Sequence, residues 1–298
     1  MERALKSPEQ RFLPLYILVS IVSWASAYPV VRLAMRDIPP IPLASLRYML
    51  AATLGLLWLA WKRPALPSLR DCPRLVLSGI LGITLYNIFF NLGEQSVSSG
   101  VTSLIIASAP IMAGLMAVAF TKETLSLFGW LGSLLGFGGI ALIVSGQKGG
   151  FSIDSGAVLE VLAAFCTASY VVLQRPLLHR YGGLTVTACV LIIGAVFLSP
   201  WLGEGSKILL NAPPRAWLCV IELGVLPAAI GYASWSYVIH ALGVAKGTIF
   251  LYFLPPMTFL LAFFLEGSWP DLYTILGGAI VMIGVALAHK KKRPSLKA

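Results

Sequence analysis

The chain has 298 residues, of which 58% are hydrophobic and only 11% are charged. A soluble domain carries about 25% charged residues, so this composition excludes an ordinary soluble globular protein. The formal net charge of +10 would suggest nucleic-acid binding in a soluble chain. Membrane proteins collect Lys and Arg in their cytoplasmic loops. We therefore expect a lipid bilayer as the partner, and no nucleic acid.

Apolar windows, each near the roughly 20 residues that cross a bilayer, follow one another with short connections. The first window follows a basic tail and contains Ala25-Ser26-Ala27, which resembles a secretory cleavage site. We predict a retained span, because the window continues past this motif and residues 24–28 are echoed by residues 166–170. In chain order the expected spans are 12–34, 41–61, 73–92, 98–120, 126–146, 155–174, 184–202, 216–239, 244–265 and 270–289.

The distribution of basic residues predicts the orientation of these ten spans. With the N-terminus inside, the inner segments hold 16 of the 22 Lys and Arg residues, the outer segments hold 5, and Arg47 lies within a span. Short cytoplasmic segments are enriched in Lys and Arg. We therefore expect both termini to be cytoplasmic.

The chain contains an internal repeat, because residues 98–146 are echoed by residues 244–290. Both stretches have a proline inside an apolar run, a lone glutamate, and two glycines seven residues apart. The shared residues are Pro110, Glu123, Gly132 and Gly139 in the first stretch and Pro256, Glu266, Gly277 and Gly284 in the second. Five spans is an odd number, so the second copy must cross the membrane in the opposite direction. We predict an all-α membrane protein whose ten transmembrane helices form two inverted five-helix repeats, 1–147 and 151–298, around a central cavity.

Polar and aromatic residues inside the spans are the candidates for binding a substrate. Asn87, Asn91 and Glu94 share one helical face, and amides facing lipid are costly, so we expect the two amides to point inward. Glu94 is expected at the interface, because it lies near a span end. The alternative is that the amides only bond neighbouring helices and that the rings are interfacial. The candidates are Trp24, Tyr28, Tyr86, Asn87, Asn91, Tyr170, Tyr232, Trp235, Tyr237 and Tyr252.

Prolines and glycines suggest how the spans bend and pack. Pro29, Pro110, Pro255 and Pro256 are predicted hinge or gating positions, since proline removes a backbone donor and kinks helices. The alternative is tolerated proline, which is common in membrane helices. The repeated glycines predict that the fifth and tenth spans pack against each other. Such a pair can form within one chain or between two, so a monomer is compatible with the sequence.

No motif predicts catalysis, a cofactor or a metal site. The chain has no HExxH, GxSxG or Walker pattern, its three histidines are scattered, and its four cysteines form no CxxC pair. Few ionisable residues lie deep in the apolar windows. Arg47 is close enough to a span end to snorkel, while Glu160 and Glu222 lie in the first turns of their spans.

The repeat resembles a known family. The pattern of Pro110, residues 123–126 (ETLS), Gly132 and Gly139, with its second copy, resembles the EamA-type repeat of the drug/metabolite transporter superfamily, over nearly the whole chain. Residues 24–29 (WASAYP) resemble the family's first helix, and the chain is most similar to the YddG-type exporters of aromatic and other amino acids. The second copy departs from the pattern, with a shorter spacing between Pro256 and Glu266.

The resemblance implies export of small molecules, with amino acids favoured, across the bacterial inner (plasma) membrane by alternating access. Another metabolite or drug class is the alternative. A nucleotide-sugar carrier would need cationic residues in the cavity, where only Arg47 is near. An intramembrane enzyme would need a reactive polar cluster, and a channel would conduct faster than a carrier; we expect neither.

Overall fold

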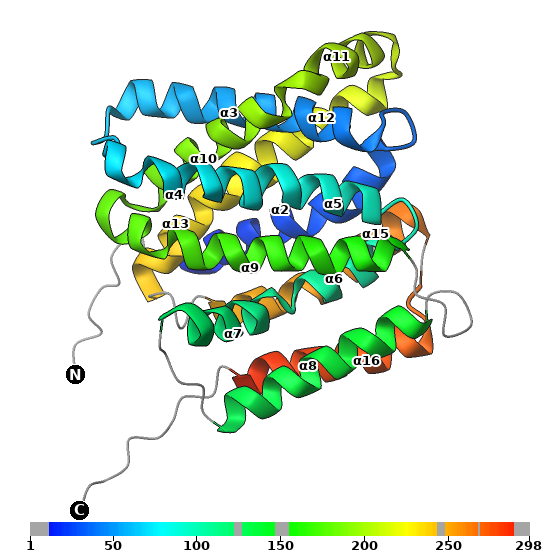
Figure 1. Ribbon diagram of the computed structural model, residues 1–298. Coiled ribbons are helices and arrows are strands. Elements are labelled where there is room, and N and C mark those ends of the chain that lie inside the picture. Colours follow the sequence, from blue (N-terminus) through cyan, green and yellow to red (C-terminus); the bar gives the residue numbers. More distant parts are fainter. Residues whose placement is uncertain (1–11, 122–126, 147–154, 243–247, 268, 289–298) are drawn as a thin grey trace, which may run out of the picture.

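The computed structural model describes residues 12–121, 127–146, 155–242, 248–267 and 269–288 (Figure 1). Every element of secondary structure in these ranges is helical. In the first half the elements are α2 (Leu13–Ala34), α3 (Pro40–Lys62), η1 (Leu69–Asp71), α4 (Cys72–Gly79), η2 (Ile80–Leu85), α5 (Tyr86–Gly93), α6 (Ser99–Ile106), α7 (Ala109–Thr121) and α8 (Leu127–Gly146). In the second half they are α9 (Ser155–Tyr181), α10 (Gly183–Leu198), η3 (Ser199–Trp201), α11 (Leu202–Asn211), α12 (Pro214–Val225), η4 (Leu226–Gly231), α13 (Tyr232–Leu242), η5 (Thr248–Phe253), α15 (Leu254–Glu266) and α16 (Leu272–Ala288).

The helices are membrane-spanning in length and surface. Within the described ranges, seven helical stretches are long and apolar enough to cross a bilayer, and three shorter apolar helices accompany them. Many of the side chains exposed on the outside are large and apolar, such as Leu57, Leu134 and Phe264. A water-soluble protein rarely exposes such a surface, whereas lipid accepts it. The expected all-helical membrane protein is confirmed, while the number of spans stays a prediction.

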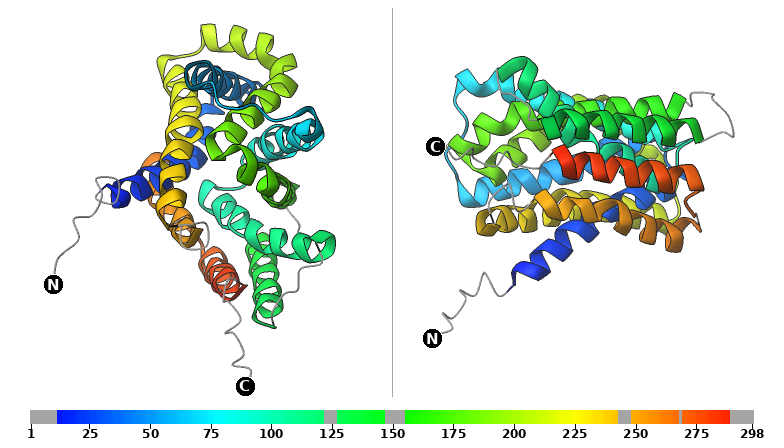
Figure 2. Two further views of the ribbon diagram at one scale, coloured as in Figure 1. Left: turned by 90° about the vertical axis from the view of Figure 1, so that its left-hand side faces the viewer. Right: turned by 90° about the horizontal axis from the view of Figure 1, so that it is seen from below.

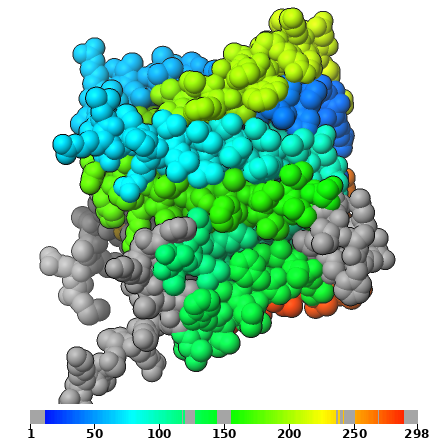
Figure 3. Space-filling view, in the orientation of Figure 1, coloured from blue at the N-terminus to red at the C-terminus, as the bar shows by residue number. Residues whose placement is uncertain are grey.

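Figure 1 places the beginning of α2 and the end of α16 at the same end of the bundle. This arrangement agrees with an even number of crossings. Figure 3 shows α4 with α5 and α9 as neighbouring ridges across one face of the bundle, and α10 lies between α4 and α3. Glu123 of the repeat motif and both expected domain boundaries lie outside the described residues.

Two π-helical segments occupy matching places in the two halves. The segment η2 interrupts the third expected span and η4 interrupts the eighth, and their bounds are offset by 146 residues. A π-helix widens the turn and frees backbone groups for other partners, and such segments are frequent at functional sites. Pro227 lies within η4, where its missing N–H leaves one further carbonyl without an intrahelical donor.

Three of the four predicted proline positions fall where helices begin. The helix α6 ends at Ile106 and α7 begins at Ala109, which places Pro110 in the first turn of α7. In the second half, Pro255 and Pro256 stand in the first turn of α15, directly after η5. Proline is well suited to a helix start, where its missing N–H would be unpaired anyway. Pro29 differs, because it is buried inside α2.

The glycine-bearing helices α8 and α16 pack against each other, as predicted, and this contact forms within one chain. A Cβ atom on Gly139 would lie 2.7 Å from the Gly277 carbonyl oxygen, and one on Gly284 would lie 2.6 Å from the Gly132 carbonyl oxygen. The two backbones therefore touch, and only glycine permits that approach. Viewed along the helices, the pair stands at the edge of the bundle, away from α3 and α11 (Figure 2).

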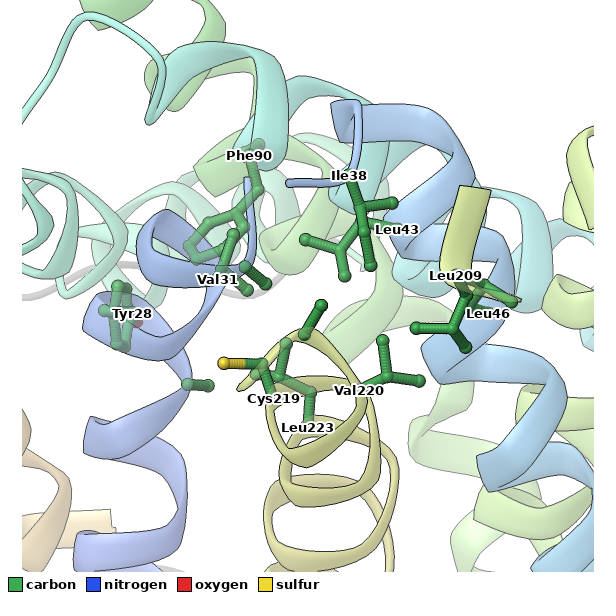
Figure 4. Close-up of a cluster of buried hydrophobic side chains, with 14 residues drawn as sticks. Tyr28, Val31, Ile38, Leu43, Leu46, Phe90, Leu209, Cys219, Val220 and Leu223 are labelled. Atoms are coloured by element: carbon green, nitrogen blue, oxygen red, sulfur yellow. The ribbon is translucent and has the colours of Figure 1, made fainter. Parts of the chain in front are cut away.

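The structure adds one helix that the sequence pattern did not predict. The helix α11 follows the seventh expected span, where a loop was expected, and α9 continues to Tyr181, beyond the predicted end. Gly205 of α11 lies against α3, with its Cβ position 3.1 Å from the Pro42 carbonyl oxygen. Leu209 of α11 is buried in an apolar cluster with residues of α2, α3, α5 and α12 (Figure 4). Packing against this cluster explains why a short polar-rich segment becomes helical.

Candidate functional site

The first helix of the chain meets the π-helical segment of the second half. Trp24 Nε1 of α2 donates a hydrogen bond to the Pro227 carbonyl oxygen at 3.0 Å. Its ring also contacts the rings of Tyr232 and Trp235, each with 5.3 Å between centroids. The indole N–H therefore supplies a hydrogen-bond donor for a carbonyl of η4, and backbone groups in an apolar environment require such a partner. The indole ring also holds two aromatic rings in place.

A second aromatic group lies one turn further along α2. The Tyr28 ring packs edge-on against Phe90, and Tyr86 stacks on Phe90, with 5.4 Å between centroids in each pair. Tyr28 and Phe90 are buried. Tyr86 follows η2 directly, as Tyr232 follows η4 directly, so the two tyrosines occupy equivalent positions in the two halves.

Tyr48 of α3 links the two aromatic groups. It lies within electrostatic range of Tyr86, Tyr170 and Tyr232. Tyr170 of α9 packs against η2, because a Cβ atom on Gly82 would lie 2.5 Å from its ring. Phenol rings from α3, α5, α9 and α13 thus converge on one region of the bundle. Aromatic faces with polar edges suit a small amphiphilic solute.

Both predicted amides point inward. Asn87 and Asn91 have no exposed surface. Asn87 Nδ2 donates to the Ile83 carbonyl oxygen in η2, and Asn91 Nδ2 donates to the Pro40 carbonyl oxygen, both at 2.7 Å. Their Oδ1 atoms have no hydrogen-bond partner within the described ranges. Each amide therefore fixes a backbone position with its donor and keeps an acceptor for a further partner.

A buried cation and a partly buried carboxylate lie beside these rings. Arg47 is 5% exposed, and its guanidinium carbon lies 5.0 Å from the centre of the Tyr48 ring. Glu222 of α12 accepts a hydrogen bond from Ser26 Oγ at 2.5 Å. The two charged groups are within electrostatic range of each other. The expectation that Arg47 snorkels to the membrane surface is therefore wrong, because its side chain is enclosed by the helices.

Acidic residues gather near the end of the bundle where α5 ends. Glu94 and Glu160 have no exposed surface, and none of their carboxylate oxygens has a hydrogen-bond partner among the residues described. Glu160 packs on Gly93, and Arg32 forms a 3.8 Å ion pair with Glu266, which also accepts a hydrogen bond from Ser99. Burial raises the pKa of the Glu94 carboxyl well above its usual range, and the nearby charges of Glu160 and Glu266 add to this effect.

The acidic group borders an open cavity of about 490 Å³. This volume lies within the range of small-molecule sites. The cavity stands at the end of the bundle, whereas the aromatic region lies deeper. Its walls are formed by Arg32, Met35, Arg36, Glu94, Gln95, Ser98 and Glu266.

Two of the predicted binding residues lie away from the aromatic region. Tyr237 is half exposed and stacks on Tyr16, with 5.0 Å between ring centroids. Tyr252 donates a hydrogen bond to the Val285 carbonyl oxygen of α16 at 3.2 Å. In the described part of the chain, no group of three His, Cys, Asp or Glu side chains could hold a metal ion.

Sequence reasoning missed the four charged groups Arg47, Glu94, Glu160 and Glu222 as parts of a site. The signal was present, since Glu94 lies on the same helical face as Asn87 and Asn91. Counting residues from a span end suggested exposure at the interface. Neighbouring helices instead cover Arg47, Glu94 and Glu160, and they cover the Oε2 atom of the partly buried Glu222.

Comparisons with known proteins place this geometry among transporters. The model of the EamA-like transporter family matches residues 12–145 and again residues 154–289. The uncharacterized transporter YdfC of Bacillus subtilis is 32% identical over 90% of this chain and 88% of its own length. A protein of Streptantibioticus cattleyicolor named as a probable terminal-alkyne amino-acid exporter is 33% identical over 92% of both chains.

A more distant relative is named as a membrane transporter, and a solved structure has a similar fold. The uncharacterized inner membrane transporter YedA of Escherichia coli is 25% identical over 93% of this chain and 91% of its own length. A solved crystal structure with 19% sequence identity superposes with a TM-score of 0.62 and covers 93% of this chain and 96% of that chain. At this identity the structural likeness establishes the fold alone.

Proposed function

Because the chain belongs to the EamA-like transporter family, we propose that it exports amino acids, aromatic ones among them, and related small metabolites. The observation that carries this proposal is the convergence of Tyr86, Tyr170 and Tyr232 around Tyr48, with Tyr28 beside Tyr86. The printed function of the Streptantibioticus relative supports the amino-acid class. The proposed location is the bacterial inner membrane, where the Escherichia coli relative is placed by its name.

The proposed architecture is ten spans in two inverted five-helix repeats, residues 1–147 and 151–298. Three observations support it: the family model matches twice, η2 and η4 are offset by 146 residues, and the glycine contacts are reciprocal. At a shift of 145 residues, Gly132 corresponds to Gly277 and Gly139 corresponds to Gly284. The contacts cross this correspondence, because Gly132 lies against Gly284 and Gly139 lies against Gly277. Reciprocal contact of this kind is expected across a two-fold axis. The pair closes within one chain, which supports a monomer.

The proposed transport mechanism is alternating access. The first helix of each half packs against the other half, since α2 lies on η4, α13 and α15, while α9 lies on η2, α5 and α7. Movement of one half relative to the other would therefore open the aromatic region first to one side and then to the other. The proposed hinges are the ends of helical segments next to Pro110 and to Pro255 and Pro256, together with Pro29 inside α2.

The proposed binding residues are those that meet around Tyr48 and α2. The rings offer apolar faces and polar edges, and the two amides offer unused acceptors. They are Trp24, Tyr28, Tyr86, Asn87, Asn91, Tyr170, Tyr232 and Trp235. Tyr237 and Tyr252 remain predicted binding residues that lie outside this group.

The experiment that tests the proposal is transport by the purified protein in liposomes. A panel of labelled amino acids should give saturable flux, with and without a proton gradient. Tyr232→Ala should lower the flux, while Tyr273→Ala, on the exposed face of α16, should leave it unchanged. Absence of saturable flux for every amino acid would refute the proposed substrate class and favour the alternative of another metabolite or drug.

The proposed orientation has both termini in the cytoplasm, as the distribution of basic residues predicts. Reporter fusions at the two ends test it in cells, because a cytoplasmic fluorescent protein and a periplasmic phosphatase are each active on one side only. Both ends should report the cytoplasm. Ends on opposite sides of the membrane would contradict the ten-span architecture.

A further inference from the structure

We propose that Arg47 and Glu222 together bind the zwitterionic headgroup of an α-amino acid. Arg47 takes the carboxylate, and Glu222 takes the ammonium group. This assignment rests on the proposed function and specifies which part of the substrate is recognised. It also explains why two opposite charges lie within the bundle beside the aromatic rings.

Arg47 has the properties of an anion site. Its side chain is 5% exposed, and its Nε and Nη1 atoms have no hydrogen-bond partner in the described part of the chain. A guanidinium stays protonated in proteins, and a buried charge without a partner is strongly unfavourable. The Tyr48 ring lies over the guanidinium and leaves its edge available. That planar edge matches a carboxylate, which it can bind through two parallel hydrogen bonds.

Glu222 supplies the matching negative group. One of its oxygens is held by Ser26 Oγ at 2.5 Å, while the other, Oε2, has no hydrogen-bond partner among the residues described. The serine therefore fixes the carboxylate and leaves one acceptor for a cationic donor. An ammonium group offers three donors, so it can bond Oε2 and still reach neighbouring acceptors.

The two groups interact without satisfying each other. They are within electrostatic range, yet they form no ion pair within the described ranges, and each keeps unused hydrogen-bonding atoms. A purely anionic ligand would be repelled by Glu222, and a purely cationic ligand would be repelled by Arg47. A zwitterion meets both charges with the correct sign.

The surrounding helices hold this pair in place beside the aromatic rings. The helices α3 and α12 approach closely, because a Cβ atom on Gly224 would lie 2.7 Å from the Leu50 side chain. Tyr86 and Tyr232 are both within electrostatic range of Arg47. A headgroup bound at Arg47 would therefore direct the amino-acid side chain toward the aromatic rings.

The test compares three ligands that differ only in the headgroup. Counterflow of the best-transported labelled amino acid is measured in liposomes, with unlabelled competitor amino acid, its decarboxylated amine and its deaminated carboxylic acid. For phenylalanine the last two are phenethylamine and 3-phenylpropanoate. In the wild type the amine and the acid should each compete at least tenfold more weakly, the scale of one charge-assisted hydrogen bond.

Variants assign each half of the headgroup to its residue. Arg47→Gln should weaken competition by the amino acid and by the acid about tenfold or more, and leave the amine unchanged. Glu222→Gln should weaken the amino acid and the amine by a similar factor and leave the acid unchanged. Arg63→Gln, at the exposed end of α3, and Glu204→Gln, on the exposed face of α11, are the matched controls and should behave as the wild type.

The outcomes separate this inference from the proposed function. A wild type that moves no amino acid refutes the function. The headgroup site is overturned if the wild type transports amino acids but the amine competes as strongly as the amino acid. It is also overturned if Arg47→Gln weakens competition by all three ligands equally. If Arg47→Gln does not fold, Arg47→Lys keeps the charge and should retain the preference for the acid over its neutral amide. If neither variant folds, the wild-type competition pattern alone decides.

Discussion

The contact between α8 and α16 allows one substitution to be compared with its immediate neighbour. In Gly139→Ala the new methyl group would lie 2.7 Å from the Gly277 carbonyl oxygen and 2.8 Å from the Val281 backbone nitrogen. Both atoms belong to backbone, so the helices must separate. Overpacking of this kind costs about 1–3 kcal/mol, and the better helix propensity of Ala returns at most about 1 kcal/mol. We expect Gly139→Ala to lower the free energy of unfolding by about 1–2 kcal/mol.

Gly138→Ala is the control, because its Cβ position has no atom within 4 Å among the residues described. Here only the helix propensity changes, and the free energy of unfolding should rise by up to about 1 kcal/mol. Unfolding in mixed detergent micelles, followed by far-ultraviolet circular dichroism, measures both variants. Gly284→Ala should match Gly139→Ala, since it meets the Gly132 carbonyl oxygen and the Gly136 backbone. Equal changes at positions 138 and 139 would refute the backbone contact.

Two further predictions concern polar groups away from this contact. Trp24→Phe removes the donor to the Pro227 carbonyl oxygen and should lower the free energy of unfolding by about 1–3 kcal/mol, measured by the same method. Trp217→Phe, on the lipid-facing side of α12, is the control. Equal losses of stability in the two variants would contradict the role of the indole N–H. The raised pKa of Glu94 means that the folded state binds its proton more tightly than the unfolded state. Stability should therefore fall as the pH rises from about 4.3 through the raised value, by up to about 1.4 kcal/mol per pH unit. Glu94→Gln should flatten this dependence, and an unchanged slope in thermal unfolding at pH 5 to 8 would contradict the assignment.

Periodic features were predictable from the sequence. The glycines seven residues apart predicted the helix pair, and the spacing of Asn87 and Asn91 predicted that both amides face inward. These inferences succeed because a helix maps sequence spacing directly onto one face. The internal repeat could also be recognised from the sequence, because equivalent residues of the two halves recur at nearly constant offsets.

Features that depend on neighbouring helices were not predictable from spacing. Glu94 lies near a span end, yet α9 and the Arg32 region cover it. Arg47 lies in the second turn of α3, but its guanidinium turns inward beside Tyr48 instead of snorkelling. The helix α11 forms because Leu209 enters an apolar cluster built from distant segments. In each case tertiary packing decides the outcome, and distance along the chain does not contain that information.

Counterflow of a labelled amino acid by the purified wild-type protein tests the account most directly. Liposomes loaded with unlabelled amino acid should accumulate the labelled form transiently, with saturation, and removal of either the carboxylate or the ammonium group from the internal competitor should weaken the exchange. Liposomes that show no exchange for any amino acid, or exchange that ignores the headgroup, would contradict a transporter in which Arg47 and Glu222 receive the two charges of an amino acid.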